Sequence, residues 1–170
     1  ALPISQAYEE AALHRDQVSA LRAVREKQYV EDVTGRDADV IACARAGNVA
    51  CVNLVMIRGG RHLGDHNHFP RHVYAGDAVD DEQVVEAFIS QHYQHHSVPP
   101  LILARQVADA DALAALLAEH AGHKVQIVTR PTGPRRVWLE MAEKNAGIGA
   151  AHTASLQANQ EARLAALQQA

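Results

Sequence analysis

The sequence has few aromatic residues and no long apolar run. Phe, Trp and Tyr together make up only 4% of the 170 residues, so the core has to be built from Ala, Val, Leu and Ile. Hydrophobic residues nevertheless reach 48%, a composition that excludes an intrinsically disordered chain. The length suits one domain of ordinary size together with a flanking helix.

Cysteine is also scarce: Cys43 and Cys51 are the two present, and they fall in adjacent predicted strands. A disulfide framework requires more cysteines and an extracellular setting, so we expect two buried, reduced thiols. The sequence has no signal peptide and no apolar run near 18 residues. These features predict a cytoplasmic protein.

Positive charge is in deficit as well. The 16 Lys and Arg are outnumbered by 20 Asp and Glu, which gives a net charge of −4. A protein that binds DNA strongly by itself usually has a basic balance, because affinity depends on neutralised phosphates. Any DNA contact therefore has to use a local patch or depend on a partner.

The two ends of the sequence suggest a piece of a longer protein. The chain begins with Ala1 rather than Met, and residues 157–170 form an Ala/Gln/Leu tract of helical character without a C-cap. We therefore expect further protein on both sides.

The spacing of apolar residues predicts a leading helix, three strands, and then alternating helices and strands. Ser5 is a suitable N-cap for the leading helix, and Asp80 or Asp81 is one for the next helix. Asp109 and Asp111 lead the helix after that, which should end before Gly122. Gly59-Gly60 is a strong hairpin signal. The expected helices span about residues 5–32, 80–93, 108–120, 135–151 and 155–169, and the expected strands span residues 39–44, 49–57, 61–69, 99–104 and 124–129.

This order of elements predicts an α/β fold of the ribonuclease H-like class. Three antiparallel strands followed by two helix–strand units give a mixed five-stranded sheet with helices on its faces. The leading helix precedes this unit. Strand order says little about function, because one fold hosts many activities.

Residues 8–18, YEEAALHRDQV, resemble the second helix of the UVR motif, which is found in the UvrC family, the nuclease subunits of the bacterial UvrABC excision-repair system. Residues 50–64, 88–93 and 98–103 resemble the central region of that family, in the family's order. Further matches are Pro131, Gly133 and the L-x-x-A-x-x-N-A pattern of Leu139, Ala142, Asn145 and Ala146.

The resemblance implies a central segment of a protein that acts in nucleotide excision repair of DNA. It implies a partial UVR helix at residues 1–34, a degenerate ribonuclease H-like domain at residues 35–152, and a helical linker at residues 153–170 that leads to a C-terminal nuclease domain. It also implies a contact with UvrB through the leading helix. The residues expected in that contact are Tyr8, Glu9, Ala12, Arg15 and Asp16.

The first predicted strand lacks the carboxylate with which a ribonuclease H-like nuclease holds divalent metal ions. Residues 41–45 contain no acid, and Asp39 stands at the beginning of the strand, where we expect it to end a turn. We therefore predict no catalytic residue, no metal ligand and no cofactor in this segment, which would scaffold the nuclease and contact UvrB or DNA. A free-standing adaptor built on the UVR helix is an alternative.

Eleven histidines are many for this length, and most fall in two groups. His66 and His68 should share one strand face, and with Asp65 or His72 they suggest a zinc site for a metal-dependent hydrolase. The spacing matches no H-E-x-x-H pattern, so we favour exposed polar residues on an edge strand and at a helix end. The groups are His62, His66, His68 and His72, and His92, His95 and His96.

The residues most suited to contact DNA phosphates lie at residues 130–144 and beside the hairpin glycines. Loop amides and arginines before a helix can hold a phosphate, although such a helix start is often only a solvated basic edge. We expect Trp138 to pack in the core. The candidates are Arg130, Gly133, Arg135, Arg136 and Lys144, together with Arg58 and Arg61.

Overall fold

A computed structural model describes residues 36–70 and 79–169 of the chain. The predicted leading helix lies outside these residues, and so does His72. The five residues predicted to contact UvrB, namely Tyr8, Glu9, Ala12, Arg15 and Asp16, also lie outside them.

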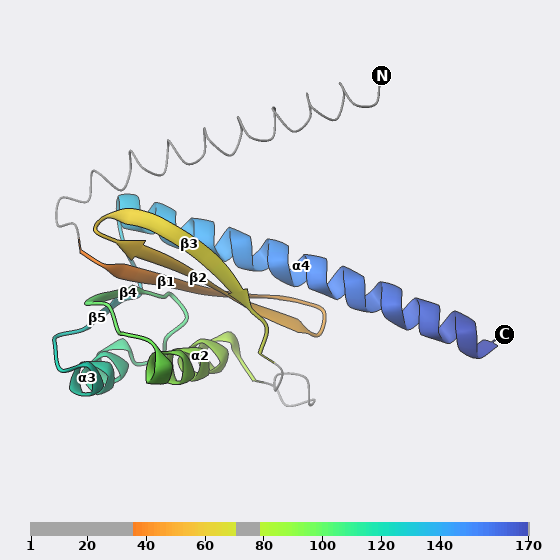
Figure 1. Ribbon diagram of the computed structural model, residues 1–170, viewed down its shortest axis with the longest axis horizontal. Helices are drawn as coiled ribbons and strands as arrows, with labels where there is room; N and C mark the ends of the chain where they lie inside the picture. The colour runs from red at the N-terminus through yellow and green to blue at the C-terminus, as the bar shows by residue number, and fades with distance from the viewer. Residues whose placement is uncertain (1–35, 71–78, 170) are drawn as a thin grey trace, which may run out of the picture.

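A five-stranded sheet with the order β3-β2-β1-β4-β5 lies at the centre of the molecule (Figure 1). The first three strands form an antiparallel meander, and the last two extend the sheet in parallel from β1. This arrangement confirms the predicted ribonuclease H-like sheet. The strands are β1 (Ala38–Ala46), β2 (Val49–Arg58), β3 (Arg61–His68), β4 (Leu101–Leu103) and β5 (Gln126–Val128).

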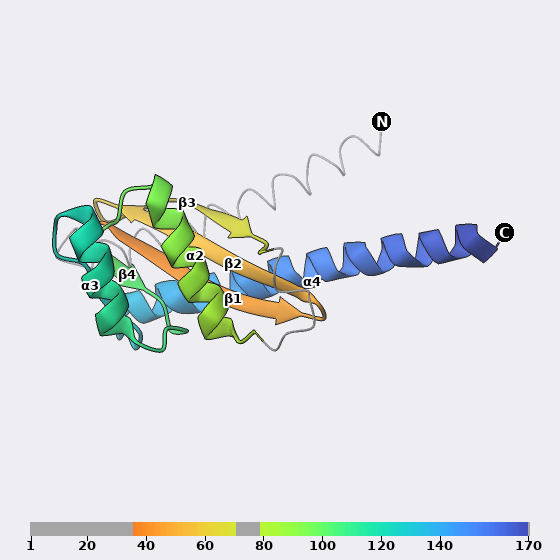
Figure 2. The same ribbon diagram turned by 90° about the horizontal axis from the view of Figure 1, so that it is seen from below.

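Helices cover both faces of the sheet, as Figures 1 and 2 show. On one face, α2 (Asp81–His95) and α3 (Ala110–Ala121) bury a core that includes Ile41, Leu54 and Ile89. On the other face, α4 (Pro134–Gln169) packs Trp138, Leu139 and Ala142 on Val40, Val55 and Ile57. Burial on both faces explains why β1 and β2 are nearly continuous apolar runs in the sequence.

The ends of α2 and α3 follow the predicted capping pattern. Asp80 accepts a hydrogen bond from the Gln83 backbone amide, and the Gln83 side chain returns a bond to the Asp80 backbone. Asp109 caps α3 in a similar way, because its side chain accepts a hydrogen bond from the Ala112 backbone amide. Gly122 ends α3 in the left-handed conformation with φ 76°, which a residue without Cβ adopts without strain.

The prediction of two separate helices after residue 134 was wrong. One continuous helix of 36 residues, α4, replaces them. No proline interrupts this stretch, and Thr153 and Ser155 only weaken a helix without ending it. Residues 155–169 are exposed and project beyond the end of the sheet (Figures 1 and 2).

The bounds of β1, β4 and β5 also differ from the predicted ones. β1 begins at Ala38, so Asp39 is inside the strand and does not end a turn. β4 and β5 are three residues each and therefore shorter than predicted. Across the described residues, no helix combines the length and apolarity needed to cross a membrane.

Candidate functional site

Asp39 is a carboxylate buried inside the sheet. It is 1% exposed and pairs in register with Met56 of β2 and Ile102 of β4. The Tyr93 hydroxyl donates to one carboxylate oxygen at 2.5 Å, and Arg58 donates to the other at 2.8 Å. These two charge-assisted bonds compensate the loss of water, which allows an acid to occupy an otherwise apolar strand.

Arg58 turns back from the hairpin toward this carboxylate. Its Nη1 also donates to the carbonyls of Ala38 at 3.1 Å and Ile57 at 2.8 Å, and its side chain is only 29% exposed. The structure therefore gives Arg58 a contact inside the domain that the sequence did not predict. Arg61, its neighbour across the hairpin, is exposed, and the phosphate contact of both arginines stays a prediction.

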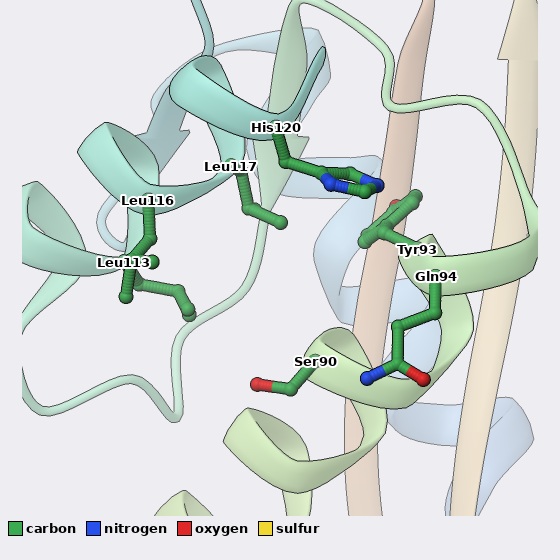
Figure 3. Close-up of a pocket in the computed structure, with 7 residues that line it drawn as sticks. All are labelled: Ser90, Tyr93, Gln94, Leu113, Leu116, Leu117 and His120. Carbon is green, nitrogen blue, oxygen red and sulfur yellow. The ribbon is translucent and has the colours of Figure 1, made fainter.

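Tyr93 connects the buried carboxylate to a small hollow between α2 and α3. Burial first, and then the charge and hydrogen bond of Asp39, raise the pKa of Tyr93 well above its ordinary value, so the hydroxyl remains a donor. Figure 3 shows the Tyr93 ring in this hollow with the His120 side chain directed toward it. The hollow measures about 200 Å³ and is otherwise lined by Ser90, Gln94, Leu113, Leu116 and Leu117.

Asp65 of β3 belongs to a separate polar group beneath α4. It accepts hydrogen bonds from the side-chain amides of Asn53 at 3.2 Å and Asn145 at 3.4 Å. Asn53 is fully buried and also donates to Asn67 at 2.8 Å. Since Asn145 is on α4 and Tyr93 is on α2, Asp65 and Asp39 point to opposite faces of the sheet.

The same alternation separates Asp65 from His66 and His68 of its strand. His68 pairs with Val52 and points toward α2, where its ring centre is 4.9 Å from that of Phe88 and 6.2 Å from that of His92. A zinc site that combines His68 with Asp65 is therefore contradicted. Within residues 36–70 and 79–169, no three His, Cys, Asp or Glu side chains are placed to hold a metal ion.

The expectation that the histidines are merely exposed was wrong for His68 and His92, which are half-buried. Burial lowers the pKa of His68 below its ordinary value of 6.5, and the neighbouring His66 and His96 lower it further. Burial also lowers the pKa of His92, again helped by His96, against an opposite effect of Asp39. Both rings are therefore neutral at pH 7.

Three rings, two on α2 and one on its C-cap residue His96, form a stacked ladder. Phe88 and His92 have ring centres 5.2 Å apart at an angle of 17°, and His92 and His96 have centres 4.2 Å apart at 7°. Their spacing of four residues places them on one face of the helix. The ladder borders a cleft of about 640 Å³ between β3 and α2, to which His68, Phe69 and His95 also contribute. The sequence showed the histidines but not their stacking.

The basic candidates around the start of α4 are partly compensated. Arg136 forms an ion pair with Glu140 at 2.9 Å, and Glu143 lies 3.3 Å from Arg105. Arg130 and Lys144 are exposed. The turn before α4 brings Arg130, Gly133, Arg135 and Arg136 together, whereas Lys144 lies about two turns further along the helix.

Gly133 supports this turn, and its carbonyl accepts from the Arg136 amide at 3.1 Å. Its φ of 61° requires the freedom of a glycine. Trp138 is 2% exposed, which confirms that it packs in the core.

Both cysteines are free and buried, as predicted. Cys43 packs in the core beneath α2, whereas Cys51 points toward Gly149 of α4, so the two thiols lie on opposite faces of the sheet. Burial raises the pKa of Cys43 to about 12 and that of Cys51 to about 11. Both thiols are thus protonated and poor nucleophiles at neutral pH.

Comparison with known proteins gives one consistent family. The family described as "UvrC Ribonuclease H-like domain" matches residues 37–153. UvrABC system protein C of Nitrosomonas europaea is 50% identical over 167 residues, which cover 97% of this chain and 27% of that protein. The same protein of Methylobacillus flagellatus is 46% identical over 163 residues, and that of Dechloromonas aromatica is 40% identical over 167 residues; both matches cover 96% of this chain and 27% of the relative. The chain thus spans about a quarter of the length of these relatives.

Proposed function

Because this chain belongs to the family of UvrC ribonuclease H-like domains, we propose that it is a non-catalytic central segment of an excision nuclease in nucleotide excision repair of DNA. Relatives named UvrABC system protein C align with almost the whole chain at 40–50% identity, which supports this role. The segment would hold the nuclease parts of the protein in place and contact UvrB, DNA or both.

The observation that carries the non-catalytic role is the placement of the strand carboxylates. A metal-dependent nuclease needs acids that converge on the same ions. In the described strands, Asp39 faces α2 and Asp65 faces α4, so they cannot share an ion. Asp39 is further occupied by Arg58 and Tyr93, and Asp65 by two asparagines. A hydrolase site that combines Asp65 with His66 or His68 is unsupported for the same reason, because these histidines lie on the other face of β3.

Contact with DNA and UvrB is the second part of the proposal. The exposed Arg130, Arg61 and Lys144 remain the best candidates for DNA phosphates because the described contacts leave them on the surface. The UvrB contact rests on the UVR-like sequence around Tyr8 and Ala12. Replacing both of these residues by Glu should abolish co-purification with UvrB while leaving the unfolding temperature of the domain unchanged. Loss of folding would instead assign those side chains to packing on this domain.

The test of the non-catalytic role is incision by a full-length UvrC protein that carries this segment. With UvrA, UvrB, magnesium and a lesion-bearing duplex, we expect Asp39→Asn and Asp65→Asn to incise at rates within about twofold of wild type per folded molecule. Removal of a true catalytic group lowers such a rate on the order of a thousandfold or more. A loss of that size in either variant, with circular dichroism unchanged, would refute the proposal.

A further inference from the structure

The cleft between β3 and α2 is unusual in its lining. Among its lining residues are two phenylalanines, four histidines and the amides of Gln83 and Gln91, and none is Asp, Glu, Lys or Arg. Phe69 lines this cleft and remains 37% exposed, so part of its ring is accessible to a ligand. The volume of about 640 Å³ lies within the usual range for small-ligand sites.

The geometry of the lining selects a flat ligand. Within the ladder, His92 is stacked between Phe88 at 5.2 Å and His96 at 4.2 Å, so a planar ligand cannot enter between these rings. His96 ends the ladder and is exposed, which leaves its outer π-face for a planar group to stack on. The imidazoles and glutamine amides provide both donors and acceptors for the edge of such a group.

The charge of the lining restricts the ligand further. The imidazoles can only become more positive, and no carboxylate in the lining would attract a guanidinium or an ammonium group. An anionic polymer that carries planar, hydrogen-bonding rings matches both properties. Nucleobases on a phosphate backbone are such a ligand, and stacking of bases on aromatic side chains is how proteins hold single strands.

We propose that the Phe88–His92–His96 ladder and Phe69 form a binding site for an unstacked base of single-stranded DNA. The choice of DNA rests on the proposed function, whereas the choice of a planar base rests on the ring geometry. If the segment works on damaged DNA, as proposed, damaged bases are the ones that cost least to unstack from the duplex.

The test is binding of a fluorescein-labelled twelve-residue oligothymidine to the 170-residue chain, followed by fluorescence anisotropy. We expect His96→Gln and Phe69→Ala to weaken binding by about tenfold each, because each removes one stacking ring. His96→Phe keeps the ring without the imidazole and should bind within about threefold of wild type. His120→Gln, which alters an exposed histidine outside the cleft, is the matched control and should leave binding unchanged.

An abasic oligomer of equal length and charge separates bases from phosphates. It should bind at least tenfold more weakly than oligothymidine to the wild-type chain. Equal binding of the two oligomers, or weakening by Arg130→Gln and Lys144→Gln but not by the cleft variants, would place DNA on the basic residues and overturn the inference. Absence of any oligothymidine binding, or binding of apolar peptides in its place, would also overturn it.

Failure of this inference and failure of the proposed function can be told apart. If His96→Gln and Phe69→Ala leave full-length UvrC incision unchanged and the chain does not bind oligothymidine, the cleft has another role but the scaffold proposal stands. If the chain binds oligothymidine through the cleft and Asp39→Asn abolishes incision, the cleft assignment stands and the non-catalytic role does not.

Discussion

At the scale of single residues, the most consequential group is the buried Asp39 with its two donors. A carboxylate that is 1% exposed is tolerable only while it is paired, because its desolvation is not otherwise compensated. Arg58 supplies the charge and Tyr93 supplies the second hydrogen bond. The Asp39 carboxylate therefore has a structural role, and Arg58 and Tyr93 should be as important for the stability of the domain as Asp39 itself.

Replacing Arg58 by Gln should destabilise the domain by about 3 kcal/mol, because it leaves a buried charge without its cation. The measurement is urea unfolding followed by circular dichroism. Arg61→Gln, at the paired position across the hairpin, is the control and should change the unfolding free energy by less than about 0.5 kcal/mol. Adding Asp39→Asn to Arg58→Gln should recover part of the loss. Equal effects of the two arginine variants would contradict the structural role of Arg58.

The half-buried histidines predict a dependence of stability on pH. His68 and His92 have folded-state pKa values below the ordinary 6.5, so the unfolded chain binds protons more readily than the folded one. Their contribution to stability is complete above pH 6.5 and falls as the pH drops through 6.5 toward the folded pKa. After burial, His66 and His96 lower the pKa of His68 further, and His96 and His68 lower that of His92, whereas Asp39 raises the pKa of His92.

The unfolding temperature should therefore decrease between pH 7.5 and pH 5.5, and His68→Phe should make that decrease smaller. The control is His120→Gln, which replaces an exposed histidine and should show the same decrease in unfolding temperature as the wild type. A stability that rises on acidification, or an unchanged slope in His68→Phe, would count against the buried neutral histidines.

At the scale of elements, the contact between α4 and the meander is set by one glycine. A Cβ added at Gly149 would lie 2.7 Å from Nδ2 of Asn67, closer than real Cβ atoms approach, and 3.0 Å from Sγ of Cys51, which is a tight contact. Gly147, two residues earlier on the same helix, has nothing within 4 Å of the same atom. The helix therefore lies close to β2 and β3 at one point, where a methyl group fits only if the Asn67 side chain, which accepts a hydrogen bond from Asn53, moves away.

Gly149→Ala should lower the unfolding free energy by about 1–3 kcal/mol, because the overpacking outweighs a gain in helix propensity of up to about 1 kcal/mol. Gly147→Ala gains the propensity without the clash and should stabilise the chain by up to about 1 kcal/mol. Thermal unfolding of both variants measures the difference. Stabilisation by both alanines would show that α4 sits further from the sheet than described.

At the scale of the whole molecule, the sequence predicted the structural features that depend on residues close together along the chain. The element order, the Asp80 and Asp109 caps and the Gly59-Gly60 hairpin are local features, and each appears in the structure. The surroundings of Asp39 could not be predicted, because Tyr93 is 54 residues away and reaches it only through the packing of α2 on β1. The Phe88–His92–His96 ladder has the four-residue spacing of one helix face, so the sequence contained the signal that could have predicted it. The approach of His68 to this ladder depends on the pairing of β3 with β2, which the sequence does not specify.

The two halves of α4 should differ in protection against hydrogen exchange. Residues 138–150 are fixed by the sheet and should exchange only on global unfolding, whereas the exposed residues 155–169 depend on their own helix propensity, which is marginal at that length. Exchange measured by mass spectrometry after peptic digestion should show at least tenfold faster labelling of the second half. Equal protection would reveal a contact that covers the exposed half.

A helix that is anchored over half its length transmits an angle to whatever is attached beyond it. Each residue of α4 advances the backbone by about 1.5 Å and rotates it by about 100°. One alanine inserted after Ser155 would leave Trp138 and Gly149 seated on the sheet and swing everything downstream by more than a quarter of a circle. Seven inserted residues would nearly restore the heading and add about 10 Å of reach. The number of residues in this exposed stretch is thus itself a geometric parameter of the protein.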